Sequence, residues 1–156
     1  MEIRNIKVSD IPLCASIMVR NPIWQRYQVS EDSARARFAK GVENNATILI
    51  AEELGSVVGF IWYVHQGAFN RSGYIMLIGV DPDAQSHGIG YALMDAAEKE
   101  MFKSNADIFL LVSDFNVKAQ QFYKRLGYQQ VGVLENYVIP GVNELIFRKH
   151  INDQKA

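Results

Sequence analysis

A glycine-bearing stretch between an apolar run and an amphipathic run is the part of this sequence best suited to binding a ligand. It reads VDPDAQSHGIGYALMDAAE and covers residues 80–98. The run before it predicts a strand, and the run after it predicts a helix. A helix N-terminus attracts anions because its first N–H groups are unpaired, and Gly88 and Gly90 lack the Cβ atoms that would keep a phosphate away. The stretch therefore predicts either a phosphate-binding loop or a plain turn.

Two common nucleotide-binding loops do not fit this stretch. A P-loop needs Gly-Lys-Ser/Thr, whereas Tyr91 and Ala92 follow Gly90. A dinucleotide fingerprint needs its first glycine directly after the strand and a third glycine where Leu93 stands. A phosphate-binding loop here must therefore belong to another class.

The stretch resembles the acetyl-CoA loop of the Gcn5-related N-acetyltransferase (GNAT) family, which reads Val-x-Pro and then Arg/Gln-x-x-Gly-x-Gly/Ala. The matching positions are filled by Val80, Pro82, Gln85, Gly88 and Gly90. The family often has a glycine directly after Gln85, where this chain has Ser86. A serine still supplies its backbone N–H unless the position needs a positive φ.

A second segment, SDFNVKAQQFYKRLGYQQVG at 113–132, resembles the other signature of the same family. That signature is an Asn, an Ala three residues on, an aromatic pair, and Gly-Tyr/Phe closing a helix. The matching residues are Asn116, Ala119, Phe122, Tyr123, Gly127 and Tyr128. Both signatures stand in the usual order, so the resemblance implies one GNAT acetyltransferase domain over residues 1–156.

The resemblance also implies roles for particular residues. Strands 74–80 and 107–113 would splay apart around the pantetheine arm, and the N–H of Val80 would face the thioester oxygen as an oxyanion donor. Tyr123 would contact the coenzyme and protonate its sulfur as general acid, with Phe122 in the core, and Asn116 would cap the following helix and contact the cofactor. The pyrophosphate would bind to the backbone of Gln85, Ser86, His87, Gly88, Ile89, Gly90 and Tyr91.

The general base is not evident from the sequence. Many family members carry a glutamate on the strand before the loop, but YIMLIGV at 74–80 contains no carboxylate. His65, Asp114 and Glu144 are alternatives, each of which also suits an ordinary surface or turn position. An α-amino group, with a pKa near about 8, hardly needs a strong base.

An acetyl-CoA-dependent N-acetyltransferase acting by direct transfer in a ternary complex is the leading hypothesis. The acceptor would be a primary amine of a small molecule, peptide or protein, and Trp24 and Tyr27 either line its pocket or pack on the sheet. Cys14 is not expected to carry the acyl group, because its helical spacing places it in the core. A non-catalytic acyl-CoA-binding or sensing module is the alternative, which the missing glutamate favours and Tyr123 opposes.

The composition is that of an ordinary globular protein. Of 156 residues, 49% are hydrophobic and 21% charged, and the net charge of −1 argues against a nucleic-acid-binding surface over the whole molecule. The single cysteine excludes an internal disulfide. No signal sequence and no membrane-spanning run is found, so we expect a cytoplasmic protein without membrane or metal partners. A homodimer through the terminal strands is possible.

The elements that position these residues follow from hydrophobic periodicity. Strands are expected at 2–8, 46–53, 56–64, 74–80, 107–113, 128–134 and 143–151. Helices are expected after Ser9 and Ser30 as N-caps, then from the glycine loop to about residue 102, and at 116–126. Leu54-Gly55 predicts a hairpin turn and 65–73 a polar loop. The fold class is α/β (α+β): a GNAT-like, mixed, mostly antiparallel twisted sheet of six to seven strands flanked by about four helices.

Overall fold

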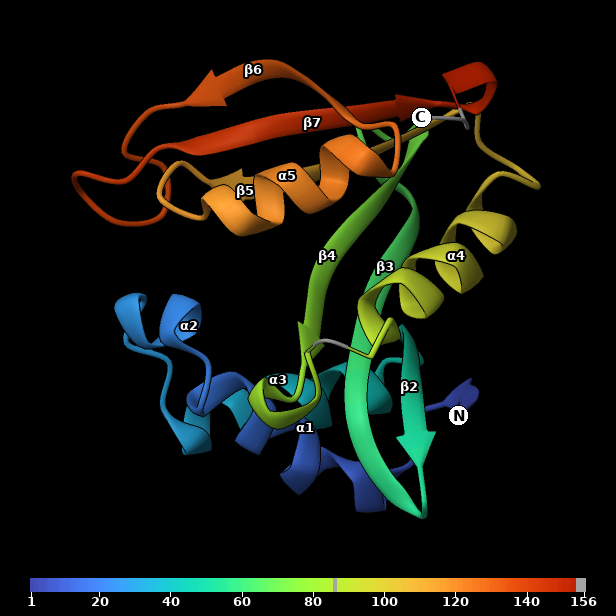
Figure 1. Ribbon diagram of the computed structural model, residues 1–156, viewed down its shortest axis with the longest axis vertical. Coiled ribbons are helices and arrows are strands. Elements are labelled where there is room, and N and C mark those ends of the chain that lie inside the picture. Colours follow the sequence, from blue (N-terminus) through green and yellow to red (C-terminus); the bar gives the residue numbers. More distant parts are fainter. Residues whose placement is uncertain (86, 154–156) are drawn as a thin grey trace. The chain divides into compact units, whose positions relative to one another are not determined.

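The computed structural model of the protein describes residues 1–85 and 87–153 (Figure 1). Seven strands form a mixed sheet in the order β1-β2-β3-β4-β5-β7-β6, as the fold prediction requires. The strands are β1 (Glu2–Asn5), β2 (Thr47–Glu53), β3 (Ser56–Ala68), β4 (Ser72–Val80), β5 (Asp107–Ser113), β6 (Gln129–Leu134) and β7 (Glu144–His150). The helices are α1 (Ile11–Val19), α2 (Pro22–Arg26), α3 (Glu31–Glu43), α4 (Ile89–Met101) and α5 (Val117–Arg125), with 3-10 turns η1 (Val8–Asp10), η2 (Pro82–Ala84) and η3 (Ile151–Asp153).

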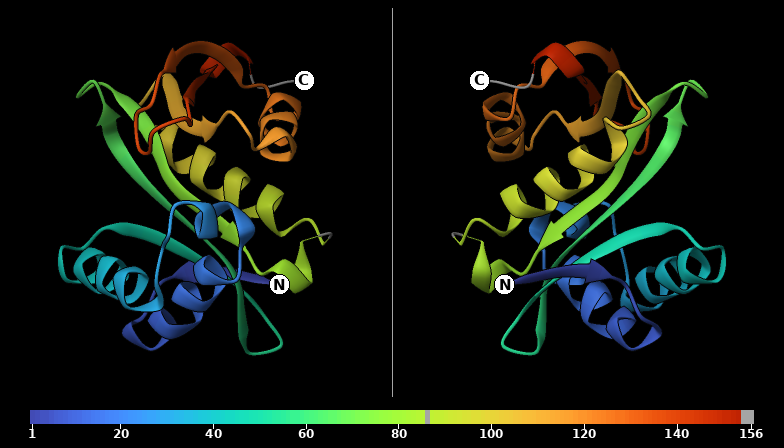
Figure 2. Two further views of the ribbon diagram at one scale, coloured as in Figure 1. Left: turned by 90° about the vertical axis from the view of Figure 1, so that its left-hand side faces the viewer. Right: turned by 90° about the vertical axis from the view of Figure 1, so that its right-hand side faces the viewer.

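Contacts divide the chain into two compact units. The first unit comprises Met1–Tyr63 and Leu77–Glu98, and the second comprises Val64–Met76 and Lys99–Ala156. In the first unit, β1, β2 and β3 pair antiparallel, and α1 packs against α3 (Figure 2). The predicted hairpin turn between β2 and β3 is confirmed, because Leu54 and Gly55 both have positive φ values, of 50° and 78°.

The second unit contains the antiparallel strands β5, β7 and β6, with the outer ends of β3 and β4. A parallel ladder joins Gly73–Ile75 of β4 to Ile108–Leu110 of β5. Helix α5 lies alongside the strands of this unit (Figure 1). It contacts β7 through Tyr123, whose ring centroid lies 6.3 Å from that of Phe147. The aromatic side chains of α5 and β7 therefore form part of the core of this unit.

Two predicted elements differ in the structure. The predicted polar loop at 65–73 is largely strand: β3 continues to Ala68, β4 begins at Ser72, and Phe69 and Asn70 turn the chain with φ values of 58° and 53°. Its composition suggested a loop because the side chains at this end of β3 are exposed, although the backbone is extended. The proline-bearing segment after α1, for which no helix was predicted, forms the short helix α2, with Asn21 as N-cap.

The first helix begins differently from the prediction, whereas α3 begins as predicted. Ser30 accepts a hydrogen bond from the N–H of Ser33 at 3.0 Å and so caps α3. Ser9, however, lies inside η1, and Asp10 is the residue before α1. Asp10 accepts the N–H of Lys7 at 2.7 Å and two hydrogen bonds from the Arg4 guanidinium at 2.7 and 2.9 Å. Because Asp10 pairs with Arg4 of β1, Asp10 is the buried residue that precedes α1, and Ser9 does not cap this helix.

We expect Asp10→Asn to lower the free energy of unfolding by about 2–4 kcal/mol at pH 7, because it breaks a largely buried ion pair. The Asp10 and Arg4 side chains are only 7% and 18% exposed. Hydrogen bonding by Arg4 lowers the pKa of Asp10, so its contribution is complete at neutral pH and is lost as the pH falls through the folded-state pKa. Urea unfolding should therefore show the two proteins converging below about pH 4.

Glu31→Gln is the matched control for Asp10→Asn. Glu31 pairs with Arg35 on the surface of α3, with both side chains about half exposed. Exposed pairs of this kind contribute about 0.5 kcal/mol or less. A loss at Asp10 no larger than this, or a loss that does not change with pH, would contradict the assigned role of the Arg4–Asp10 pair.

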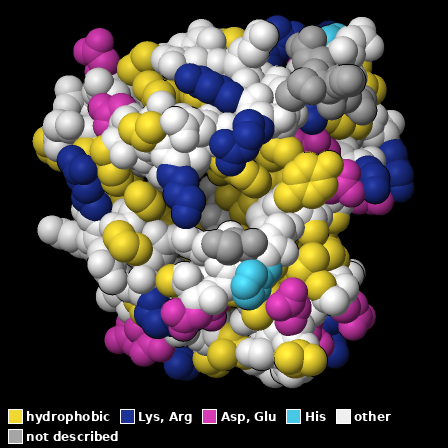
Figure 3. All heavy atoms as spheres, in the orientation of Figure 1, with side chains coloured by type: hydrophobic (Ala, Val, Ile, Leu, Met, Phe, Trp, Pro, Cys, Tyr) yellow, Lys and Arg dark blue, Asp and Glu magenta, His cyan; other side chains and the backbone are white. Residues whose placement is uncertain are grey.

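The described residues include no helix of sufficient length and hydrophobicity to cross a membrane. On the face shown in Figure 3, acidic and basic side chains occur together, with hydrophobic side chains scattered between them. This agrees with the nearly neutral net charge of the chain.

Candidate cofactor-binding site

The N–H of Val80 points away from its neighbouring strand β3. The next residue, Asp81, donates its N–H to the carbonyl oxygen of Val58 in β3 at 2.8 Å. Because successive N–H groups of a strand point to opposite sides, the N–H of Val80 faces the other way. The parallel ladder between β4 and β5 ends at Ile75. The N–H of Val80 therefore points in a direction in which it could donate a hydrogen bond to a ligand.

Gly88 directly precedes α4 in a left-handed conformation, with φ at +73°. A Cβ atom at this position would meet no described atom within 4 Å. The glycine is therefore needed for the backbone angle and not to avoid a clash within the protein. It leaves open space directly outside the first turn of α4.

The first amides of α4 have no partner among the described residues. The first backbone hydrogen bond into this helix runs from the N–H of Ala92 to the carbonyl of Gly88 at 3.1 Å. No described residue accepts a hydrogen bond from the N–H groups of Gly88, Ile89 or Tyr91. These N–H groups and the positive end of the helix dipole make the start of α4 a cradle for an anion.

The predicted loop residues share an open surface. The side chains of Gln85, His87 and Tyr91 are exposed, and Tyr91 has 60% of its surface accessible. Ser86, predicted to bind the same pyrophosphate, lies outside the described residues. Ile89 is fully buried and anchors the helix start, because Gly59 of β3 leaves room for it. In the first unit, the exposed loop residues therefore lie next to a helix start that the packing of Ile89 holds in place.

An ion pair that the sequence did not predict holds the end of β4 in place. Arg20, the residue after α1, donates to both carboxylate oxygens of Asp81 at 3.2 and 2.9 Å. Asp81 also accepts the N–H of Asp83 at 2.9 Å and so caps η2, and hydrogen bonding by Arg20 lowers the pKa of Asp81. In the sequence, an aspartate before a proline indicates that Asp81 caps a turn. The residues around Arg20 give no signal that it pairs with Asp81.

Trp24 packs in the first unit against the strands that carry the site. Its ring stacks on Phe60 with centroids 6.0 Å apart, and the two rings lie 3.0 and 2.7 Å from where a Cβ of Gly79 would be. Any residue larger than glycine at position 79 would therefore overlap these two rings. This contact supports the packing alternative for Trp24 over the acceptor-pocket alternative.

In the second unit, Asn116 caps α5 as predicted. Its side-chain oxygen accepts the N–H of Ala119 at 3.2 Å. Gly127 follows α5 with φ at +98°, the left-handed conformation expected after the helix. The capping role of Asn116 is confirmed, and its contact with a cofactor stays a prediction.

Tyr123 lies in the aromatic core of the second unit, and Phe122 lies at the edge of that core. Tyr123 is 7% exposed, with ring centroids 6.0 Å from Tyr128 and 6.3 Å from Phe147, whereas Phe122 is only half-buried. The prediction that Phe122 fills the core is met only in part, because its ring centroid lies 5.4 Å from that of Tyr123 while the side chain stays partly exposed. Burial raises the pKa of Tyr123, so the phenol stays protonated through the neutral range. Its hydroxyl has no described partner and is not completely buried.

The three candidate bases occupy different settings in the second unit. Asp114 accepts the N–H of Asn143 at 3.1 Å and donates its own N–H to the carbonyl of Asn143 at 2.9 Å, which ties it to the loop before β7. Glu144 is 6% exposed and stands opposite Ser113 in the β5–β7 register. His65 is exposed on β3. The contacts of Asp114 thus give it a structural role in holding the loop before β7.

The predicted site residues fall into two sets. Val80 and residues 85–91 belong to the first unit, and Asn116 and Tyr123 belong to the second. Within the first unit, the end of β4 and the start of α4 are joined through η2. Within the second, Asn116 and Tyr123 both belong to α5 and its cap.

Known proteins share both sequence and fold with this chain. Residues 13–128 match the model of the acetyltransferase (GNAT) family. The chain is 32% identical over 112 residues to a mycothiol acetyltransferase of Propionibacterium freudenreichii subsp. shermanii, covering 70% of this chain and 36% of that protein. It is 32% identical over 111 residues to an N-alpha-acetyltransferase of Sulfurisphaera tokodaii, covering 64% of this chain and 66% of that one. This chain thus spans about a third of the length of the mycothiol acetyltransferase.

A solved structure shows the same fold. It is that of an aminoglycoside 6'-N-acetyltransferase complexed with coenzyme A, with a TM-score of 0.77, 18% identity and 97% of each chain covered. Both family signatures, at 80–90 and 116–128, lie within the segment matched by the family model. That segment makes up most of the sequence, and the protein accordingly belongs to the acetyltransferase (GNAT) family.

Proposed function

We propose that this protein transfers an acetyl group from acetyl-CoA to a primary amine. The observation that carries the proposal is the start of α4, where left-handed Gly88 opens onto N–H groups without described partners. This cradle fits a diphosphate, because it offers several N–H donors and leaves space beside them. When bound, acetyl-CoA supplies an acetyl group activated as a thioester.

The residues of this chain would divide the work as follows. The amides between Gln85 and Tyr91 hold the diphosphate, and the N–H of Val80 donates to the oxygen of the reacting carbonyl. Removing one such donor typically costs about 3 kcal/mol of transition-state stabilisation. Tyr123 holds the proton that the departing sulfur needs, because a tyrosine phenol is protonated at neutral pH.

Direct transfer between two bound substrates is the mechanism favoured by the burial of the single cysteine. Cys14, the only cysteine of the chain, is fully buried, and burial raises the pKa of its thiol to about 12. A thiol in this state is a poor nucleophile, because the thiolate is the reactive form. The acetyl group therefore has no suitable cysteine to rest on during transfer.

The acceptor is proposed to be a primary amine of a small molecule or the α-amine of a peptide or protein. The relatives named above include a mycothiol acetyltransferase and an N-alpha-acetyltransferase, which suggests both kinds of acceptor. An α-amine is partly neutral near pH 8 and so needs only weak deprotonation. This choice suits a β4 strand without a carboxylate. A single domain, a cytoplasmic location and a homodimer stay predictions from the sequence.

A non-catalytic acyl-CoA-binding module is the second candidate. It is favoured by the absence of any Asp or Glu from β4, the strand that leads into the loop. A thiol-release assay with acetyl-CoA over a panel of amines and peptides separates the two functions. Turnover on any acceptor supports the transferase. Stabilisation by acetyl-CoA without turnover on any of them supports the module.

Binding itself is tested by thermal unfolding. A ligand at 100 times its dissociation constant adds about 2.7 kcal/mol to the apparent stability. Acetyl-CoA should raise the unfolding temperature, and NADH at the same concentration should not. If neither ligand has an effect, both candidate functions are wrong.

Arg20→Gln and Asp81→Asn are expected to weaken acetyl-CoA binding to the same degree, by about 3–10-fold, with stability changed by about 1 kcal/mol or less. Either change breaks the pair that holds the end of β4 and the cap of η2. Isothermal titration calorimetry measures the affinities. If Arg20 instead contacted the diphosphate directly, Asp81→Asn would leave binding intact or strengthen it, and the positioning role would be refuted.

A further inference from the structure

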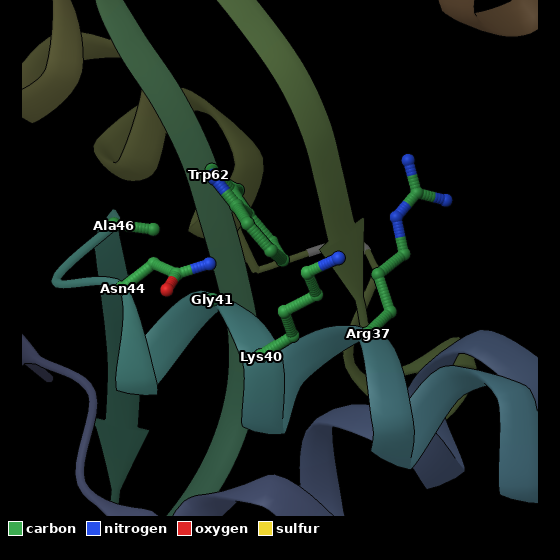
Figure 4. A pocket seen from close by; sticks show the side chains of 6 residues that line it. All are labelled: Arg37, Lys40, Gly41, Asn44, Ala46 and Trp62. Carbon is green, nitrogen blue, oxygen red and sulfur yellow. The ribbon is translucent and has the colours of Figure 1, made fainter.

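We infer that a pocket beside the last turns of α3 binds a small planar anion of the aromatic carboxylate type. The pocket belongs to the first unit, is open to solvent and has a volume of about 250 Å³. Figure 4 shows the side chains that line it. Its lining residues are Arg37, Lys40, Gly41, Asn44, Ala46 and Trp62. None of them is part of the proposed acetyl-CoA site, so the inference is independent of the proposed function.

The spacing of α3 places the polar members of the pocket on one helix face. Arg37, Gly41 and Asn44 stand at i, i+4 and i+7, with Lys40 beside them at i+3, so their side chains line one stripe. The end of the helix completes the pocket. Asn45, with φ at 56°, turns the chain so that Ala46 meets the same stripe.

An indole ring forms the apolar side of the pocket. Trp62 of β3 lies so close to Gly41 that a Cβ atom there would overlap its ring. The ring is held from the other side by Phe38, with centroids 5.8 Å apart. Only 7% of Trp62 is exposed, and part of that surface lines the pocket. The ring is therefore fixed in place before any ligand arrives.

The two cations at the pocket have no partner within the described chain. Arg37 and Lys40 are exposed, and neither forms an ion pair or side-chain hydrogen bond with a described residue. By contrast, Arg35 on the same helix pairs with Glu31. In Figure 4, the Arg37 and Lys40 side chains stand on the same side of α3 as the Trp62 ring.

The end of α3 does not itself require these cations. Two of its last carbonyls already accept hydrogen bonds: Gly41 accepts the N–H of Ala46 at 2.8 Å and Val42 accepts that of Asn45 at 3.1 Å, which is a Schellman ending. The negative end of the helix dipole acts mainly over the last turn, so an anion is best placed at the Arg37 side of the pocket.

The chemistry of the lining selects the ligand. A guanidinium and an ammonium group bind a carboxylate, and the exposed amide of Asn44 adds a hydrogen bond. The surface of the indole suits a flat apolar body against it. The volume of about 250 Å³ lies below the usual range for drug-sized ligands, so a single-ring acid is the appropriate size.

Tryptophan fluorescence tests this inference with benzoate as the probe. The chain has two tryptophans, so Trp24→Phe leaves Trp62 as the only tryptophan, and phenylalanine keeps a ring against Phe60. Benzoate is expected to change the emission saturably, whereas benzamide, of the same shape without the charge, and acetate, without the ring, are expected to bind at least about 10-fold more weakly. The indole N–H signals of the unsubstituted protein provide a second measurement, in which only one of the two signals should shift.

Charge variants decide whether the pocket is responsible. Arg37→Gln combined with Lys40→Gln should weaken benzoate binding at least about 10-fold, and Arg35→Gln, outside the pocket, should leave it unchanged. Acetyl-CoA should not displace benzoate. The inference is overturned if benzoate produces no saturable change, if benzamide binds equally well, if the double variant binds normally, or if acetyl-CoA competes.

Discussion

Replacing Gly88 by tryptophan should abolish the thermal stabilisation of this protein by acetyl-CoA while the protein still folds. A non-glycine residue at a φ of +73° costs about 1–2 kcal/mol, which most domains tolerate. No described atom lies within 4 Å of the position that the new Cβ takes, so the side chain starts in open space. The indole would instead lie where the diphosphate has to approach the amides of α4. Thermal unfolding with and without acetyl-CoA measures the loss.

Gly55→Trp is the matched control for Gly88→Trp. Gly55 also has a positive φ, of 78°, and no described atom within 4 Å of the position a Cβ would take, but it lies in the turn between β2 and β3. The two variants should therefore lose similar stability, and only Gly88→Trp should lose the response to acetyl-CoA. Equal responses in both variants would mean that the start of α4 does not bind the coenzyme.

Features set by neighbours in the sequence were predictable. The left-handed residues of the β2–β3 turn, the Ser30 cap of α3 and the Asn116 cap of α5 depend on a few consecutive residues, and each was predicted. The glycines of the predicted loop follow the same logic, because Gly88 sits directly before a helix. Local backbone chemistry thus accounts for these turns and caps, whereas the roles of Val80, Tyr123 and the loop amides were implied by the family resemblance.

Features set by distant partners were not predictable from the residues beside them. Arg20 and Asp81 pair across 61 positions, and Arg4 draws Asp10 into the place expected for Ser9. Gly79 is required by the rings of Phe60 and Trp24, which come from two other elements. Each of these depends on packing in three dimensions, for which a single sequence offers no signal.

The aromatic pair of α5 shows the same limit. Adjacent helical residues lie about 100° apart, so periodicity alone can place either one toward the sheet. Contact with Tyr128 and Phe147 places Tyr123 there and leaves Phe122 half-buried. The family resemblance had placed Phe122 in the core and had assigned Tyr123 to the coenzyme. A motif identifies residue types that occur together and does not report which of them is buried.

Tyr123→Phe should lower kcat for acetyl transfer by about 10²–10⁴-fold while KM for acetyl-CoA changes little, because only the proton donor is removed. The hydroxyl has no described partner, so its removal should not destabilise the fold. Burial raises the pKa of Tyr123, so the folded protein keeps this proton above about pH 10, where unfolded tyrosine ionises. That difference lowers the stability of the parent protein as the pH rises past about 10, and the variant should lose less stability there.

Tyr128→Phe separates proton donation from packing. Tyr128 is 1% exposed and shares the aromatic cluster with Tyr123, but Lys149 lies over its ring, 5.8 Å from the centroid. Its hydroxyl is assigned no part in transfer, so Tyr128→Phe should leave kcat within about 3-fold of the parent while changing stability by about 1 kcal/mol. Equal losses of kcat in both variants would assign the effect to the aromatic cluster. An unchanged kcat in Tyr123→Phe would remove Tyr123 as general acid, and the alkaline stability profile would still report whether its phenol is buried in the folded protein.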